Sequence, residues 1–165
     1  MTEPAADRDA QHEKYLRMAL DIGLAGARGG HGGPFGAVVV EGSRVLATCH
    51  NEVVSRKDPS AHAEVQAIRA ACAARGSFQL DGCDLYASCE PCPMCLGALY
   101  WARPRAVYFA ATRAEAAAAG FDDAFIYEEL ARPLAERQLP LHRIAVTGAE
   151  EPFRVWQALD TKIKY

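Results

Sequence analysis

The sequence predicts a three-layer α-β-α fold built on a central mixed sheet of five strands. Two observations support this prediction: short apolar runs alternate with segments of helical periodicity, and a hairpin near the start is followed by strand–helix–strand units. The chain has 165 residues, which is the usual size of one domain, so we expect residues 1–165 to form a single domain.

The first third of the chain is predicted to form a helix and a hairpin. Apolar residues between about Asp9 and Arg28 recur at helical spacing, and the glycine-rich run at residues 29–33 ends that helix. Phe35–Val40 is an apolar run typical of a buried strand, and a turn joins it to a second strand over Val45–His50. Residues 1–10 are polar, so we expect a disordered N-terminus.

The middle third is predicted to place one short strand between two helices. Ser60 is the expected N-cap of a helix over Ala61–Arg75, and Gly76 ends this helix. A strand is expected over Asp84–Ser88. The next helix is expected over Cys92–Ala102 and ends before a proline.

The last third continues the alternation of strands and helices. The expected strands are Arg105–Ala110 and His142–Thr147, and the expected helices are Ala114–Ala119, Phe125–Ala131 and Pro152–Thr161. A hairpin followed by strand–helix–strand units implies helices on both faces of the sheet.

Composition and charge argue against several classes of protein. The chain is 50% hydrophobic and 24% charged, as is ordinary for a globular protein. Its formal net charge of -3 argues against a nucleic-acid partner. It contains no run of about 18 apolar residues, so we expect no membrane span. The N-terminus lacks a targeting segment, so we expect a cytoplasmic location.

Three of the six cysteines lie in one short run, Cys89, Cys92 and Cys95. In a chain without an export signal, a C-x-x-C-x-x-C pattern indicates metal or redox chemistry instead of disulfides. The other three are expected in the core: Cys49, Cys72 and Cys83.

Two motifs indicate a catalytic metal: H-x-E at His62 and Glu64, and P-C-x-x-C at Cys92 and Cys95. Together they match the zinc-deaminase signature. One imidazole and two thiolates leave the fourth tetrahedral position to water or hydroxide, so we expect one Zn²⁺ per subunit. Glu64 is the expected carboxylate that takes a proton from this water and passes it to the leaving amine.

Other interpretations of the same residues stay open. Cys89 could join His62, Cys92 and Cys95 in a closed structural zinc site, and a C-x-x-C pair alone could be a redox pair. Because Cys89 precedes the helix and Glu90-Pro91 turns the chain there, we expect Cys89 to be a packed free thiol.

The stretches around these motifs resemble the cytidine-deaminase superfamily. They are Pro34–Ala37, Asn51, Asp58–Glu64 and Ser88–Cys95. Three more stretches resemble its bacterial guanine deaminase branch: Gly97–Pro104, Ala119–Tyr127 and the tail with Lys162, Lys164 and Tyr165. The resemblance runs from about His12 to Tyr165 and implies a cytidine-deaminase-like fold. It also implies a homodimer in which the C-terminal segment, about residues 148–165, crosses over and closes the partner's active site.

The resemblance further implies a set of substrate contacts. They come from Asn51, the backbone of Ala63, Asp123 and Tyr165, with Phe35 and Trp101 lining the pocket. Asp123 would accept hydrogen bonds from the donor edge of a guanine base and assist proton transfer. Simpler roles stay open: helix capping for Asp123, core packing for Phe35 and Trp101, and a frayed end for Tyr165.

The reaction implied by this resemblance is the hydrolytic deamination of guanine to xanthine and ammonia, in purine catabolism or salvage. The chain would then be a hydrolase acting on the C–N bond of a cyclic amidine, with a small nucleobase as substrate. Guanosine, cytosine and tRNA adenosine are alternative substrates within the same superfamily. A zinc-stabilised interaction module without activity is the alternative outside the enzymes.

Overall fold

The computed structural model describes residues 5–165, which divide into one unit that ends at Asp123 and a second unit, Ala124–Tyr165. The first unit contains α1 (Ala5–Arg28), β1 (Gly36–Glu41), β2 (Arg44–His50), α2 (Val53–Arg56), α3 (Ala63–Arg75), β3 (Cys83–Cys89), α4 (Pro93–Ala102), β4 (Ala106–Ala111) and α5 (Arg113–Ala118). The second unit contains α6 (Ala124–Ala131), a short 3-10 helix (Leu134–Glu136) and α7 (Glu151–Ala158).

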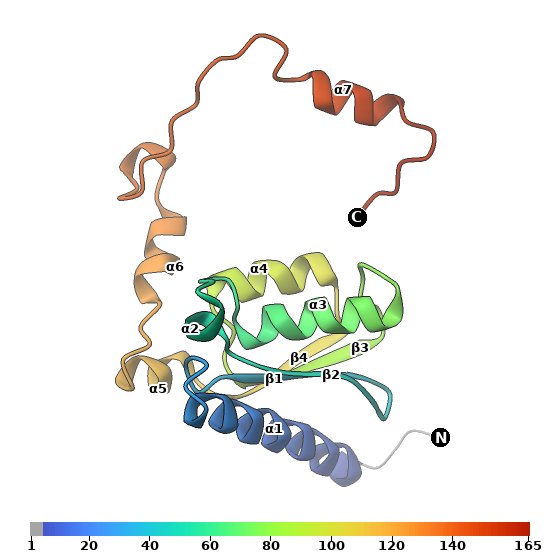
Figure 1. Ribbon diagram of the computed structural model, residues 1–165, viewed down its shortest axis with the longest axis vertical. Helices are drawn as coiled ribbons and strands as arrows, with labels where there is room; N and C mark the ends of the chain where they lie inside the picture. The colour runs from blue at the N-terminus through green and yellow to red at the C-terminus, as the bar shows by residue number, and fades with distance from the viewer. Residues whose placement is uncertain (1–4) are drawn as a thin grey trace. The chain divides into compact units, whose positions relative to one another are not determined.

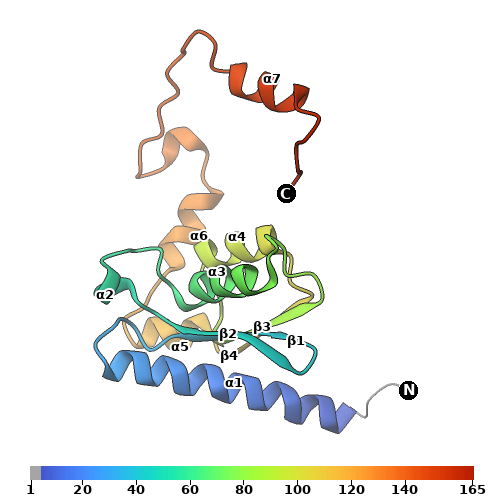
Figure 2. The ribbon, with the colours of Figure 1, turned by 45° about the vertical axis from the view of Figure 1, so that its right-hand side comes forward.

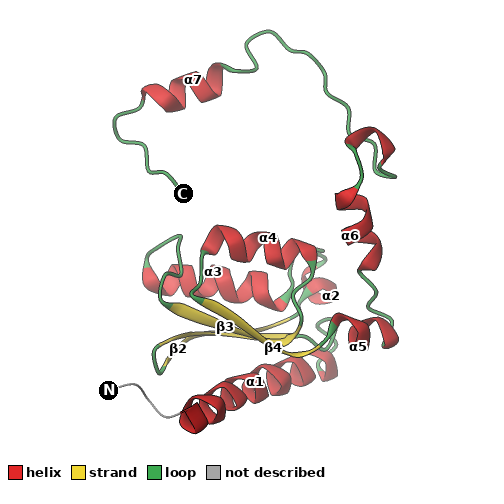
Figure 3. Ribbon diagram, turned by 180° about the vertical axis from the view of Figure 1, so that it is seen from behind, coloured by secondary structure: helices red, strands yellow, loops and turns green. Residues whose placement is uncertain are grey.

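The sheet of the first unit has four strands within the described residues, in the order β2-β1-β3-β4. β1 pairs antiparallel with β2 and with β3, whereas β3 and β4 are parallel, so the sheet is mixed as predicted. α1 covers one face, and α3 and α4 cover the other (Figure 1). The same three layers are visible from two further directions (Figures 2 and 3). The predicted three-layer α-β-α arrangement is therefore confirmed.

β1 is the central element of the core because both of its faces are buried. Ala37 and Val39 pack in the apolar cluster that α3 and α4 share with the sheet. Val38 and Val40 belong to a second cluster, which includes Tyr15 of α1. Side chains alternate between the two faces of a strand, and β-branched residues suit such a position. A strand buried on both faces reads as an unbroken apolar run, which explains the pattern in the sequence.

Two glycines allow α1 to approach the sheet closely. A Cβ atom on Gly36 would overlap the backbone oxygen of Ala19, and a Cβ atom on Gly23 would lie 2.8 Å from the Gly36 nitrogen. Glycine is the residue that permits such close backbone contact. The start of β1, which directly follows Phe35, is thereby held against the helix.

The fifth predicted strand, His142–Thr147, is wrong. Residues 142–147 form no strand, and Ile144 and Val146 are 76% and 65% exposed. Their β-branched side chains fit a strand, but a strand also needs a neighbouring strand to pair its N–H and C=O groups. The second unit, which the structure describes in full, contains no strand to pair with.

Two helix starts differ from the prediction by two residues or more, and those of α4, α5, α6 and α7 differ by one. α1 begins at Ala5, so residues 5–10 are helical where the sequence suggests disorder; residues 1–4 lie outside the described residues. Alanine and arginine, four of the six residues 5–10, favour helix, which accounts for the extension. α3 begins at Ala63 with His62 as N-cap, because Ser60 is engaged elsewhere. The backbone N–H and the hydroxyl of Ser60 donate to Oδ1 of Asp58 at 2.8 and 2.7 Å.

The second unit consists of short helices without a buried core of its own. All of its side chains are exposed or half-buried. The apolar residues of α7 include Phe153 and Trp156, which are 70% and 40% exposed. Across the part of the chain that the structure describes, no helix is both long and apolar enough to cross a membrane.

Candidate metal and substrate site

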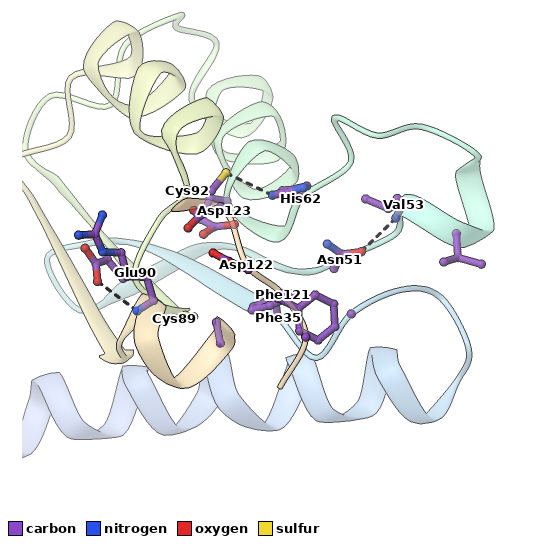
Figure 4. A pocket seen from close by; sticks show the side chains of 16 residues that line it. Phe35, Asn51, Val53, His62, Cys89, Glu90, Cys92, Phe121, Asp122 and Asp123 are labelled. Carbon is purple, nitrogen blue, oxygen red and sulfur yellow. Dashed lines mark hydrogen bonds between the residues drawn. The ribbon is translucent and has the colours of Figure 1, made fainter. Parts of the chain in front are cut away.

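Two helix N-termini meet at the candidate metal site. His62 and Cys92 are the N-cap residues of α3 and α4, and Cys95 lies in the first turn of α4. Neither N-cap side chain makes a capping hydrogen bond. The imidazole of His62 is instead directed toward the Cys92 sulfur (Figure 4). The positive end of a helix stabilises a thiolate, so this position suits metal-binding cysteines.

The distances within this group fit a tetrahedral zinc ion. Nδ1 of His62 lies 3.6 Å from Sγ of Cys92 and 3.5 Å from Sγ of Cys95. Zinc–nitrogen bonds of about 2.0 Å and zinc–sulfur bonds of about 2.3 Å at tetrahedral angles would separate such atoms by about 3.5 Å. The ligand atoms of the three residues all lie within 4.8 Å of one another. His62, Cys92 and Cys95 therefore form a possible zinc site, and three ligands leave the fourth position open.

The electrostatics of this group favour one thiolate. Hydrogen bonds with Cys95 and then with His62 lower the pKa of Cys92 to about 4. The hydrogen bond with Cys92, followed by burial, raises the pKa of Cys95. The hydrogen bond with Cys92 also raises the pKa of His62. Cys92 is therefore ionised at neutral pH, and the thiolate is the form of cysteine that binds metals.

Glu64 lies beside the three possible ligands. It is the second residue of α3 and is 7% exposed, and its Oε2 accepts a hydrogen bond from the Cys95 thiol at 3.5 Å. Burial raises the pKa of its carboxyl, and the negative charge at Cys92 raises it further. A carboxylate with a raised pKa accepts a proton more readily than an ordinary one, as general acid–base catalysis requires. The position and pKa of Glu64 thus suit proton transfer next to a metal.

Cys89 lies outside the group of possible ligands. It ends β3, it is buried, and its Sγ donates to the backbone oxygen of Thr112 at 3.6 Å. Burial raises the pKa of this thiol, which keeps it protonated. Cys89 is therefore the packed free thiol that the sequence predicts. The remaining cysteines are also free and pack in or against the core: Cys49, Cys72 and Cys83.

A cavity of about 370 Å³ opens beside the possible zinc ligands. Six of the predicted site residues line it: Phe35, Asn51, His62, Glu64, Cys92 and Asp123. Figure 4 labels five of them, Phe35, Asn51, His62, Cys92 and Asp123, which come from the starts of α3 and α4, the strand ends and the loop after α5. The fold therefore brings a possible metal group, a buried carboxyl and polar and aromatic side chains to one cavity.

The amide of Asn51 is held in one orientation. Its Oδ1 accepts a hydrogen bond from the backbone N–H of Val53 at 3.1 Å, and the residue is 5% exposed. Because the oxygen is engaged, the side chain offers its NH₂ group to a ligand. Gly32 provides the space for this arrangement, because a Cβ atom there would overlap Asn51 Oδ1.

Asp123 reaches the cavity from the loop after α5. Burial raises the pKa of its carboxyl, and the charge at Cys92 adds to this effect. Phe121 also lines the cavity, although it was not among the predicted site residues. The signal that identifies it is Gly120, whose φ of 94° marks a chain reversal directly before it. Other lining residues that were not among the predicted site residues include Val53, Val54, Cys89, Glu90 and Arg113.

Two predicted contact residues do not line this cavity, and a third belongs to the other unit. Ala63 is fully buried in the core, and Trp101 lies on α4 and is 63% exposed. Tyr165 belongs to the second unit and is 68% exposed. Substrate contacts from these three residues stay predictions.

The chain is similar in sequence to a known protein family and to known deaminases. A family model described as the zinc-binding region of cytidine and deoxycytidylate deaminases matches residues 9–111. The chain is 50% identical to guanine deaminase of Bacillus subtilis over 154 residues, which is 93% of this chain and 99% of the relative. It is 44% identical to a tRNA-specific adenosine deaminase of Aquifex aeolicus over 99 residues, which is 60% of this chain and 65% of the relative.

A solved structure extends the comparison to three dimensions. The crystal structure of guanine deaminase from Bacillus subtilis matches with a TM-score of 0.91 at 50% identity, covering 93% of this chain and 98% of the other. This similarity extends past residue 111, where the match to the family model ends, and into the last third of the chain.

Proposed function

The chain belongs to the cytidine and deoxycytidylate deaminase family, and from this membership we propose that it deaminates guanine to xanthine and ammonia with Zn²⁺ as cofactor. The observation that carries the choice of guanine is the 50% identity to a guanine deaminase over 99% of that relative's length. The possible zinc ligands and the buried carboxyl of Glu64 supply the chemistry that a hydrolytic deaminase needs.

His62, Cys92 and Cys95 would hold the zinc ion. When bound, zinc makes water a nucleophile at neutral pH by lowering its pKa from about 16 to about 7. His62 and Cys92 both line the cavity, so a zinc ion held by them would be accessible from it. Substrate and water therefore meet next to these ligands.

Glu64 moves the protons of the reaction. As the oxygen of water bonds to C2 of guanine, Glu64 takes one proton from it and delivers this proton to the ring nitrogen N3. It then takes the second proton from the hydroxyl on C2 and delivers it to the amine, and ammonia leaves as the C2–N bond breaks. A carboxyl with a raised pKa suits both the uptake and the release of a proton.

Asn51 and Asp123 recognise opposite edges of the base. The NH₂ group of Asn51 donates to a ring or carbonyl acceptor of guanine, because the amide oxygen is bonded to Val53. Asp123 accepts from the N1–H and the 2-amino group and assists proton transfer. Phe35 lines the cavity as an aromatic wall for a planar base.

We also propose a homodimer in which about residues 148–165 close the active site of the partner subunit. Exposed apolar side chains support this proposal, on α7 at Phe153 and on α4 at Tyr100 and Trp101. In the dimer, Tyr165, Trp101 and the backbone of Ala63 complete the substrate contacts, and residues 1–165 act as one catalytic domain. The expected cytoplasmic location stays a prediction.

Ammonia release from a panel of substrates tests the proposed function. The purified, zinc-loaded protein is incubated separately with guanine, guanosine, cytosine and adenosine. We expect rapid release from guanine alone. Release from guanosine or cytosine but not from guanine would retain the roles of zinc and Glu64 and overturn the assignment of the substrate. No release from any of the four would contradict the proposed reaction.

A further inference from the structure

We propose that Phe121 is a positioning residue that holds Asp123 in the cavity, an inference that rests on the proposed function of this site. Phe121 lies two residues before Asp123 and is the last apolar residue of the first unit. Both side chains line the same cavity. Three features of the surrounding structure connect them. They are the chain reversal after α5, the position where the Phe121 ring packs against Phe35 and Gly33 (its seat), and the attachment of that seat to the sheet.

The chain reversal fixes where Phe121 leaves α5. Gly120 has a φ of 94°, a conformation that side-chain-bearing residues rarely adopt. Its N–H donates to the oxygen of Ala117 at 2.9 Å, and the N–H of Phe121 donates to the oxygen of Ala116 at 3.0 Å. These two bonds end the helix in the manner of a Schellman motif. The backbone of Phe121 is therefore tied to α5, and the chain turns there toward the cavity.

The ring of Phe121 has a defined seat. It contacts the ring of Phe35 edge-on, with centroids 4.9 Å apart and an interplanar angle of 83° (Figure 4). This geometry is preferred for aromatic pairs. Gly33 leaves the space, because a Cβ atom there would lie 2.8 Å from Cε2 of Phe35 and 3.1 Å from Cε1 of Phe121. The seat thus consists of one aromatic ring and one glycine.

The seat is joined to the elements that hold the rest of the site. The N–H of Phe35 donates to the oxygen of Gly33 at 2.8 Å, and the oxygen of Phe35 accepts from the N–H of Asn51 at 2.9 Å. Asn51 directly follows β2, and Phe35 directly precedes β1. A ring packed on Phe35 therefore fixes the loop after α5 in the same frame as Asn51, and Asp123 is placed relative to it.

The consequence concerns the geometry of base recognition. Asn51 and Asp123 are the proposed contacts for opposite edges of guanine, so their separation has to match the base. Displacement of a substrate-positioning group by about 1 Å can cost a hundredfold in rate. Without the Phe121 ring, the Asp123 carboxylate is still present, but it is displaced from its position in the cavity.

A double-mutant cycle with Asp123 tests this inference. Phe121→Ala, Asp123→Asn and the double variant are compared with the wild type for kcat and KM, zinc content and thermal stability. We expect Phe121→Ala to lower kcat/KM by about ten- to a hundredfold, with zinc content unchanged. In the Asp123→Asn background, the same change should lower kcat/KM less than about twofold, because a residue that acts only through Asp123 has no further effect. Phe121→Tyr should restore most of the activity.

Phe78→Ala is the matched control, because Phe78 is 50% exposed and does not line the cavity. It should leave kcat/KM unchanged. Additive effects in the cycle would overturn the inference and make Phe121 a direct wall of the substrate site. An unchanged kcat/KM in Phe121→Ala would also overturn it.

Failure of the proposed function is distinguishable from failure of this inference. If the wild type releases ammonia from another base and not from guanine, the proposed substrate is wrong, and the mutant cycle is measured with that other base. A crystal structure of Phe121→Ala gives a readout without turnover, and an Asp123 loop in its original place would contradict the inference.

Discussion

The two units of the chain differ in how much of their apolar surface they bury. In the first unit, apolar clusters fill both faces of the sheet, and β1 is buried on both sides. In the second unit every side chain is exposed or half-buried, including the apolar residues of α7. Both units contain helices, so helical propensity alone does not produce a core. A helix is stabilised mainly when its apolar face packs on another surface, and only the first unit supplies a sheet for that purpose.

The same contrast applies to function. The first unit contains the possible zinc ligands, Glu64 and the cavity. The second contains Tyr165 and the apolar face of α7, which we propose to act on a partner subunit. If this division is right, metal binding depends on the first unit alone, whereas full turnover also needs the second. The predictions below test that division, beginning with the largest effect.

Removal of one ligand should have the largest effect. Cys92→Ala should lose zinc and all measurable guanine deamination, because two ligands bind a zinc ion far more weakly than three. Metal content by mass spectrometry and ammonia release provide the measurement. Cys89→Ala is the matched control: this neighbouring thiol lies outside the ligand group, so zinc should be retained. Unchanged zinc stoichiometry in Cys92→Ala would disprove the ligand assignment.

Glu64→Gln should separate metal binding from catalysis within the first unit. The variant keeps the size of the side chain and removes its ability to carry a proton. We expect zinc to be retained and kcat to fall by about 10²- to 10⁴-fold, the usual contribution of general acid–base catalysis. Steady-state kinetics on a sample of confirmed metal content is the measurement. Full activity would rule out Glu64 as the proton carrier.

Gly32→Ala should disturb substrate recognition without touching the metal ligands. The new Cβ atom would overlap Asn51 Oδ1 and displace the amide that is bonded to Val53. We expect kcat/KM to fall by roughly ten- to a hundredfold, as for the loss of one buried hydrogen bond of about 1–3 kcal/mol. Gly29→Ala is the matched control, because a Cβ atom there lies no closer than 3.3 Å to its neighbours. Equal activity of the two variants would argue against a role for Asn51.

The candidate metal site could be predicted from the sequence because its signals are local. Each ligand belongs to a short motif, and helix periodicity places both motifs at helix starts. The structure adds that His62 and Cys92 are themselves the N-cap residues. Ser60 was the expected cap because serine is a common N-cap residue, but an Asp58 side chain two residues away competes for it. The usual preference for serine, threonine, aspartate or asparagine at an N-cap therefore does not apply where the N-cap side chain is a possible metal ligand.

The parts that could not be predicted depend on distant neighbours. Ile144 and Val146 are β-branched and suit a strand, yet pairing depends on a partner that the pattern does not identify. Phe121 lies in the stretch Ala119–Tyr127 that carries the family resemblance, but only its contact with Phe35 shows where its ring packs. Sequence pattern therefore predicted most elements of the first unit and the possible metal group, whereas the missing fifth strand and the packing of loops had to come from the structure.

Deletion of Tyr165 tests the second unit. If the C-terminal segment closes the partner's site, the deletion should lower kcat/KM by about tenfold, the value of one hydrogen bond of about 1.4 kcal/mol, and leave zinc content unchanged. Mixing this variant with Cys92→Ala should then raise activity, because a hybrid dimer combines an intact metal site with an intact partner tail. Activity that equals the average of the separate samples would contradict an exchange between subunits.

The smallest effect should come from Gly76→Ala, which changes the stability of the first unit and not its site. Gly76 ends α3 with a φ of 66°, a left-handed conformation that costs an alanine about 1 kcal/mol. For a chain of this size that cost lowers the melting temperature by roughly 2–4 °C. Gly76→Asn should lose less, because asparagine tolerates this conformation better. Gly76 does not line the cavity, so kcat/KM at a temperature well below melting should stay the same in both variants. A loss of activity without a change in melting temperature would mean that the end of α3 is coupled to the site, and that the first unit does not keep stability and catalysis apart.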